Sequence, residues 1–193
     1  MLNGDQIRDC FAALNDELRK EGHKGEIGIV GGAVMCLVYN ARKATRDVDA
    51  VFEPSQIIRR AAAKIARLRG LPADWLNDGA KRYLVGSFTR ETVATYSNLL
   101  VWAPEARYML AMKCISARWD SSDRDDVIFL IKHLKIASAK AVFEIIQDYY
   151  PKAQIPAKTQ FFLEELFEES CAEQATPDLT TTAHSMLLLR RTN

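Results

Sequence analysis

The chain has 193 residues, of which 48% are hydrophobic and 26% are charged, and its formal net charge is +1. That is enough apolar material for a core, and the length suits one domain, or a core domain with a small helical annex. No apolar stretch is long enough to cross a bilayer and the N-terminus does not read as a signal peptide, so we expect a cytoplasmic protein with no membrane partner.

Hydrophobic periodicity predicts helices and strands in alternation over the first part of the chain. Helices are indicated by apolar residues at helical spacing, and strands by short β-rich or alternating runs. The predicted elements are a helix over 5–21, a strand over 26–30, a helix over 33–39, a strand over 47–52, a helix over 56–69 and a short helix over 73–82. Glycine or proline stands at several of the boundaries between them.

The remaining elements change from strands to helices near residue 104. Two strand-like runs are followed only by helical patterns, and Pro151 ends one of them. The predicted elements are strands over 84–90 and 92–102 that could pair as a hairpin, a helix that starts at Pro104, and helices over 123–134, 139–150 and 158–170. We therefore expect an α+β core over 1–103, a C-terminal helical region over 104–171, and a polar tail over 172–193.

The segment 29–53 holds the residues that indicate chemistry. Gly31-Gly32 lies where a strand passes into a helix, so small residues and backbone amides there could accommodate a phosphate. Asp47 and Asp49 are two residues apart on a strand, so their side chains face the same side. Two neighbouring carboxylates repel each other unless a cation lies between them, and oxygen ligands suit Mg²⁺.

This order of a strand, Gly31-Gly32, a helix and an Asp47-Val-Asp49 strand resembles the nucleotidyltransferase superfamily. The connecting residues 42–46, which read Arg-Lys-Ala-Thr-Arg, make the segment similar to the AbiEii-type toxin branch. The resemblance implies a nucleotidyltransferase-like mixed sheet flanked by helices. It also implies Mg²⁺ or Mn²⁺ held by the two aspartates, and an NTP substrate bound through the two glycines and Arg42, Thr45 and Arg46.

The same resemblance extends more weakly to about residue 134. AbiEii-like proteins carry a Lys on a helix, followed by an acidic segment, and Lys113 with Asp123 and Asp126 matches this pattern. The resemblance implies that Lys113 contacts nucleotide phosphates, and that Asp126 positions Lys113 or assists the acceptor hydroxyl. Arg118 matches an Arg that often follows the Lys.

One feature departs from the superfamily pattern. Many nucleotidyltransferases carry a third carboxylate on a later strand of the same sheet, but the run 93–102 contains no Asp or Glu. Glu91 lies just before that run. The general base that would deprotonate an acceptor hydroxyl is therefore unassigned.

The resemblance implies metal-dependent transfer of a nucleoside monophosphate from an NTP to a hydroxyl of RNA or protein, in a toxin–antitoxin context with a cognate partner protein. A catalytically degenerate interaction module, such as an antitoxin or assembly partner with the same fold, is the alternative. A third interpretation is a nucleic-acid binder that uses the basic helix 56–69, although charged helix faces are more often simply solvated.

Overall fold

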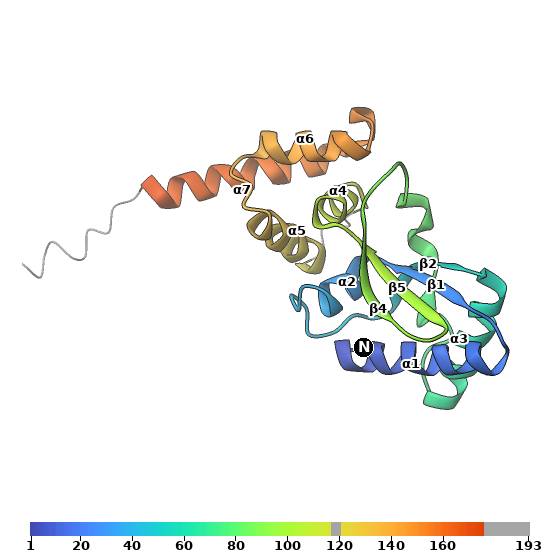
Figure 1. Cartoon of the computed structure of the whole chain (residues 1–193). Coiled ribbons are helices and arrows are strands. Elements are labelled where there is room, and N and C mark those ends of the chain that lie inside the picture. Colours follow the sequence, from blue (N-terminus) through green and yellow to red (C-terminus); the bar gives the residue numbers. More distant parts are fainter. Residues whose placement is uncertain (117–120, 176–193) are drawn as a thin grey trace, which may run out of the picture.

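The computed structural model describes residues 1–116 and 121–175, which form an α+β fold with one five-stranded mixed sheet (Figure 1). The N-terminal elements are α1 (Gly4–Lys20), β1 (Gly25–Ile29), α2 (Gly31–Leu37), β2 (Val48–Glu53), α3 (Ser55–Arg69), β3 (Leu76–Asn77), the 3₁₀ helix η1 (Gly79–Tyr83), β4 (Arg90–Thr95) and β5 (Leu99–Pro104). Helices follow, namely α4 (Ala106–Ser116), α5 (Ser121–His133), α6 (Ala139–Tyr149), the 3₁₀ helix η2 (Lys152–Gln154) and α7 (Ala157–Ala175). The expected α+β class, with a mixed sheet ahead of a helical region, is confirmed.

The strands follow the order β3-β2-β1-β5-β4 across the sheet. β1 is antiparallel to β2 and parallel to β5, while β2 and β3 are parallel and β4 and β5 are antiparallel. β2 therefore lies between β1 and the two-residue strand β3; it carries Asp49, whereas Asp47, predicted on the same strand, lies one residue before β2 begins. This places the N-terminal end of β2 beside the loop that leads into η1.

One face of the sheet is covered by α1 and α3. Ile27 and Ile29 of β1 are fully buried on that face, and a Cβ added at Gly25 would contact Leu18 of α1 and Ile58 of α3. Because side chains alternate along a strand, the residues between them point to the opposite face. On β2 this opposite face carries Asp49 and Val51, which are only half-buried.

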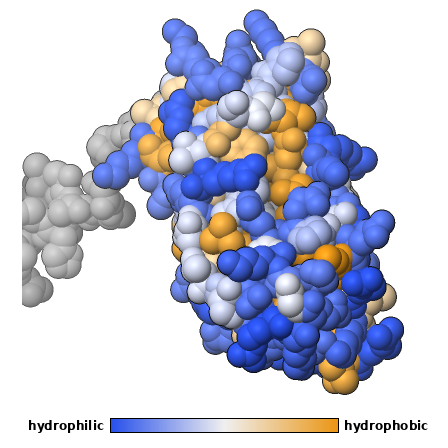
Figure 2. Space-filling model, turned by 45° about the vertical axis from the view of Figure 1, so that its right-hand side comes forward, coloured by the Kyte–Doolittle hydropathy of each residue, from blue (hydrophilic) through white to orange (hydrophobic). Residues whose placement is uncertain are grey.

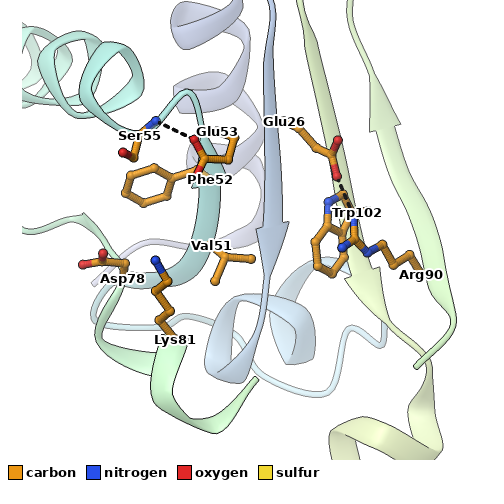
Figure 3. Close-up of a pocket in the computed structure, with 9 residues that line it drawn as sticks. All are labelled: Glu26, Val51, Phe52, Glu53, Ser55, Asp78, Lys81, Arg90 and Trp102. Carbon is orange, nitrogen blue, oxygen red and sulfur yellow. Dashed lines mark hydrogen bonds and ion pairs between the residues drawn. The ribbon is translucent and has the colours of Figure 1, made fainter. Parts of the chain in front are cut away.

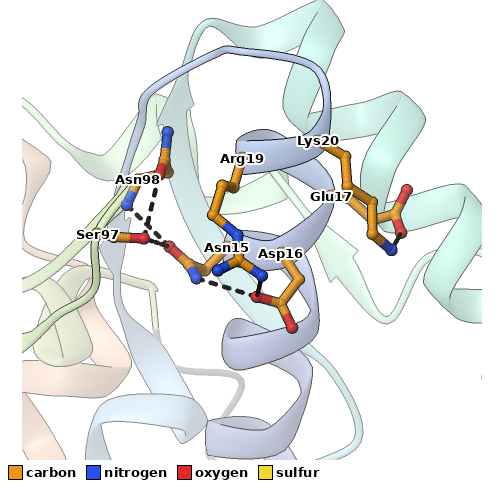
Figure 4. A network of polar contacts seen from close by, with 7 residues as sticks. All are labelled: Asn15, Asp16, Glu17, Arg19, Lys20, Ser97 and Asn98. Carbon is orange, nitrogen blue, oxygen red and sulfur yellow. Dashed lines mark hydrogen bonds and ion pairs between the residues drawn. The ribbon is translucent and has the colours of Figure 1, made fainter.

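The helix α1 is fixed at both ends. An Asn3–Gln6 capping box starts the helix. Near its C-terminal end, the side-chain oxygen of Asn15 accepts a hydrogen bond from the backbone N–H of Asn98 at 2.8 Å (Figure 4). The side chain of Asn98 in turn donates to the carbonyl of His23. This network fastens the helix to the turn between β4 and β5.

Aromatic residues attach the C-terminal helices to the segment that runs from η1 toward β4. The Tyr108 hydroxyl of α4 accepts a hydrogen bond from the Val85 backbone N–H at 2.9 Å, and Tyr150 donates to the carbonyl of Tyr83. Beyond this contact, α6 and α7 extend away from the sheet (Figure 1). Most of the surface in Figure 2 is hydrophilic, and the exposed apolar atoms gather mainly in the upper half of that view. Among the described residues no helix is both long and apolar enough to cross a membrane.

Several predicted boundaries were wrong. The predicted strand over 84–90 does not form, and the predicted single strand over 92–102 is divided by a turn into parts of β4 and β5, which are the two strands that pair. The predicted helix over 73–82 is instead β3 followed by η1. The reason is tertiary: Trp75 is fully buried and donates its indole N–H to a carbonyl of α3, which lays the following residues beside β2. α7 continues to Ala175, so the first residues of the predicted tail are helical. Arg118 and the remainder of the tail from 176 lie outside the described residues.

Candidate functional site

A cleft of about 1080 Å³ lies over the face of the sheet that α1 and α3 leave uncovered, with α4 and α5 on its far side. All nine residues that the sequence assigned to catalytic or nucleotide-binding roles line this cleft. They are Gly31, Gly32, Arg42, Thr45, Arg46, Asp47, Asp49, Lys113 and Asp126. The structure therefore brings together residues from α2, the following loop, β2, α4 and α5, which are separated by as many as 95 positions (126 − 31).

Asp47 and Asp49 face the cleft beside the first of the two glycines. Both side chains are half-buried and flank the fully buried Val48. A Cβ added at Gly31 would lie 3.3 Å from Oδ2 of Asp49, and Gly31 adopts a φ of +63°, so only glycine fits this position without strain. The pair of carboxylates and the glycine turn thus share one wall of the cleft.

Asn77 joins this wall and was not singled out in the sequence. It pairs with Asp49 across the parallel β2–β3 ladder, and its Nδ2 donates a hydrogen bond to Oδ2 of Asp47 at 3.3 Å. Its Oδ1 accepts from the Gly79 backbone N–H at 2.9 Å. Asn77 therefore links Asp47 to the start of η1. A two-residue strand has no periodicity that could have revealed it.

Thr45 serves mainly to pack the loop against α2. It is 5% exposed and exchanges two backbone hydrogen bonds with Leu2. A Cβ added at Gly32 would overlap the Thr45 hydroxyl and lie 3.3 Å from a guanidinium nitrogen of Arg42. The second glycine is thus required because the loop that carries the Arg and Thr residues lies directly on it.

A buried ionic network forms another part of the cleft lining. Arg42 donates to both carboxylate oxygens of Asp126, at 2.7 and 2.8 Å, although the two residues are 84 positions apart. Lys113 lies 2.7 Å from Asp126 and 2.8 Å from Asp123. Lys113 and Asp126 are only 6% and 2% exposed, so these charges can be buried only because they are paired. Asp126 thereby orients both cations.

Other charged groups stand at the mouth of the cleft. Lys43, Arg46 and Arg82 are exposed and line it, as do the exposed Asp74 and Asp125. The three cations are available to an anionic ligand. Arg42, by contrast, is occupied by its carboxylate partner.

The third carboxylate of the superfamily pattern has no counterpart on the sheet beside Asp47 and Asp49. Glu91 lies on β4, three strands away from β2, and does not line the cleft. At the described positions no group of three or more His, Cys, Asp or Glu residues could hold a metal ion. The two aspartates supply hard oxygen donors that suit Mg²⁺, which commonly takes its remaining ligands from phosphates and water. The donor set therefore fits a metal that arrives with a phosphate ligand.

Two other features bear on the chemistry. Cys114 is completely buried, and burial raises the pKa of its thiol to about 12, which argues against a thiol nucleophile next to Lys113.

The basic helix α3 is largely neutralised by acidic partners. Its ion pairs are Arg59 with Asp78, Arg60 with Glu21 and Lys64 with Glu17. This weakens the interpretation of α3 as a nucleic-acid surface.

Comparison with known proteins adds no relative: no family model matches the chain, and neither a curated protein nor a solved structure matches it significantly.

Proposed function

We propose that this protein is a nucleotidyltransferase that transfers a nucleoside monophosphate from an NTP to a hydroxyl of a macromolecule, RNA or protein, in the presence of Mg²⁺ or Mn²⁺. We also propose that it belongs to a toxin–antitoxin pair and has a cognate partner protein. One observation carries it, namely that all nine nominated residues line a single cleft. Residues chosen for unrelated structural reasons would not be expected to converge in this way.

Asp47 and Asp49 would hold the divalent ion, and Asn77 would position Asp47 through its hydrogen bond. A bound ion of this kind would neutralise charge on the triphosphate and on the departing pyrophosphate. The protein itself contributes positioning and electrostatic stabilisation, because phosphoryl transfer requires little covalent participation by the enzyme.

The phosphates would be bound mainly by the exposed cations at the mouth of the cleft. Arg46 is the best placed of the two arginines that the sequence nominated, because Arg42 is held by Asp126. The amides at Gly31 and Gly32 could add hydrogen bonds, although α2 has only seven residues and so a weak dipole. Lys113 would contact the nucleotide phosphates from the position in which its ion pair with Asp126 holds it.

The proposal is tested by incubating the protein with α-³²P-labelled NTPs, Mg²⁺, total RNA and a protein lysate. We expect label on a macromolecule, and loss of that label in Asp47→Asn/Asp49→Asn. Asp125→Asn is the matched control, since this exposed aspartate lines the same cleft but lies outside the acidic pair. Equal labelling by the double variant would refute the assignment of the two acids.

A second candidate is a degenerate module that uses this fold to bind a partner without turnover. The internal neutralisation of Arg42 and Lys113 favours it, since neither cation is then available to substrate phosphate. Under this alternative, the intact protein would show no Mg²⁺-dependent NTP binding. It would instead retain its partner after both aspartates are changed to asparagine.

A further inference from the structure

The cleft and a smaller hollow on the same sheet hold their charged groups in different ways. In the smaller hollow, of about 240 Å³, Arg90 pairs with Glu26 beside Trp102 (Figure 3). These two side chains are 59% and 43% exposed, so their charges stay hydrated whether or not they pair. Lys113 in the cleft is buried, so its ammonium depends on its partners. What holds Lys113 therefore bears directly on what the cleft can bind.

Lys113 lies between two carboxylates that are held with different firmness. Asp126 is buried and also accepts both hydrogen bonds from Arg42, so leaving the lysine would leave the arginine unpaired as well. The side chain of Asp123 is 20% exposed and lies in the first turn of α5. A carboxylate in that turn is stabilised by the helix dipole, so Asp123 keeps a favourable position without Lys113. Asp123 is therefore the partner that can be exchanged.

The contact between Lys113 and Asp123 faces the proposed nucleotide site. Both residues line the same cleft as Asp47 and Asp49, where a triphosphate held through a divalent ion would carry its charged oxygens. A phosphate oxygen and a carboxylate oxygen make the same charge-assisted hydrogen bond to an ammonium, at about 2.7–2.9 Å. The oxygen of Asp123, which lies 2.8 Å from Nζ of Lys113, thus stands where a phosphate oxygen would bind.

We propose that the Asp123 carboxylate and a phosphate of the NTP compete for one position at Lys113, so that nucleotide binding displaces Asp123. The inference rests on the proposed function. Asp126 keeps Lys113 in place during the exchange, while Asp123 turns toward solvent at the start of α5. The ammonium has two anionic partners before and after the exchange, so its buried charge stays compensated. The pairing of Lys113 then limits nucleotide affinity without abolishing it.

The test compares the intact chain with Asp123→Asn, which removes the competing charge and keeps the length of the side chain. Asp125→Asn is the matched control, because it makes the same change of charge on the same helix and in the same cleft. Calorimetric titrations with Mg²⁺ use each NTP, and tripolyphosphate as the probe that lacks a base.

We expect Asp123→Asn to bind both the NTP and tripolyphosphate about tenfold more tightly than the intact chain does. That factor follows if Asp123 holds Lys113 in about nine of ten molecules, since only the remaining molecules can accept the phosphate. Asp125→Asn should change either affinity by less than about twofold, because an exposed charge is screened.

A second substitution excludes an effect peculiar to the asparagine amide. Asp123→Ser removes the charge with a short side chain that is common near helix starts, and it should tighten binding in the same direction. We expect both variants to fold, because Lys113 keeps its ion pair with Asp126, and thermal unfolding in a chelator measures this. If neither variant folds, Asp123 cannot leave Lys113 and the exchange is refuted.

The remaining outcomes separate the inference from the proposed function. If neither the intact chain nor Asp123→Asn binds any NTP, the proposed function fails. If the intact chain binds NTP and Asp123→Asn binds it equally or more weakly, the function stands and the exchange is wrong. Equal gains in Asp123→Asn and Asp125→Asn would show long-range repulsion of the phosphates, not competition for one position.

Discussion

At the scale of single residues, the carboxylate of Asp126 is the most constrained group of the site. It is 2% exposed and neutralises both Arg42 and Lys113. Asp126→Asn would leave two partly buried cations without their shared anion, and we expect a loss of about 3 kcal/mol in the free energy of unfolding. Chemical denaturation measures this loss.

Asp125→Asn provides the comparison for that measurement, because Asp125 is the exposed neighbour on the same helix. It should change the free energy of unfolding by less than about 0.5 kcal/mol. Equal effects of the two substitutions would show that the buried network does not stabilise the fold.

Asn77 offers a second residue-scale prediction, which separates positioning from a purely structural role. Asn77→Ala removes the hydrogen bond to Asp47, so the affinity for Mg²⁺ with NTP should fall by about tenfold. The melting temperature in the presence of a chelator should change little, because Asn77 is only half-buried. A fall in the chelated melting temperature with unchanged Mg²⁺ affinity would contradict the positioning role.

At the scale of elements, α1 and α3 are joined by an ionic contact whose strength depends on pH. Hydrogen bonds from Lys20 and Lys64 lower the pKa of Glu17 below its ordinary value of 4.5. Because the folded pKa lies below the unfolded one, the stabilisation is complete above the unfolded pKa and is lost as the pH falls through the folded pKa.

Glu17→Gln should therefore flatten the dependence of stability on pH below about 4.5 and lower stability at pH 7 by under about 1 kcal/mol, since both lysines are largely exposed. Thermal unfolding of both proteins between pH 3 and pH 7 measures the difference. Parallel curves over that range would show that the contact is not linked to the protonation of Glu17.

The approach of α2 to the following loop gives another element-scale prediction. Gly32→Ala places a Cβ against Thr45, so we expect a loss of about 1–3 kcal/mol in the free energy of unfolding. Adding Thr45→Ala removes the hydroxyl that collides, and the double variant should recover part of the loss. Strictly additive effects in this double-mutant cycle would contradict the direct contact.

At the scale of the whole molecule, the sequence predicted those parts of the fold that local pattern controls. The helices α1 and α3 bury apolar stripes at helical spacing, and β2 alternates buried and half-buried residues, so both kinds of element were predicted within one or two residues. The strand β3 was missed because its two residues are extended only through their pairing with β2.

The residues of the site could likewise be predicted where local pattern determines their positions, but not where tertiary contacts do. Gly31, Asp47 and Asp49 belong to one short motif, and their shared wall could be anticipated from strand periodicity. The bidentate contact between Arg42 and Asp126 could not be predicted. No local pattern indicates which of several charged residues will pair across 84 positions. The smaller hollow lined by Val51, Arg90 and Trp102 likewise depends on four strands coming together.

The central claim is that the acidic pair binds a divalent ion together with a nucleotide, and calorimetric titration of each NTP tests it most directly. The account predicts binding in the presence of Mg²⁺, loss of that binding in a chelator, and affinity weaker by at least about tenfold in Asp47→Asn/Asp49→Asn, with Asp125→Asn unchanged. Absence of binding by the intact protein, or binding indifferent both to Mg²⁺ and to the loss of the two carboxylates, would contradict it.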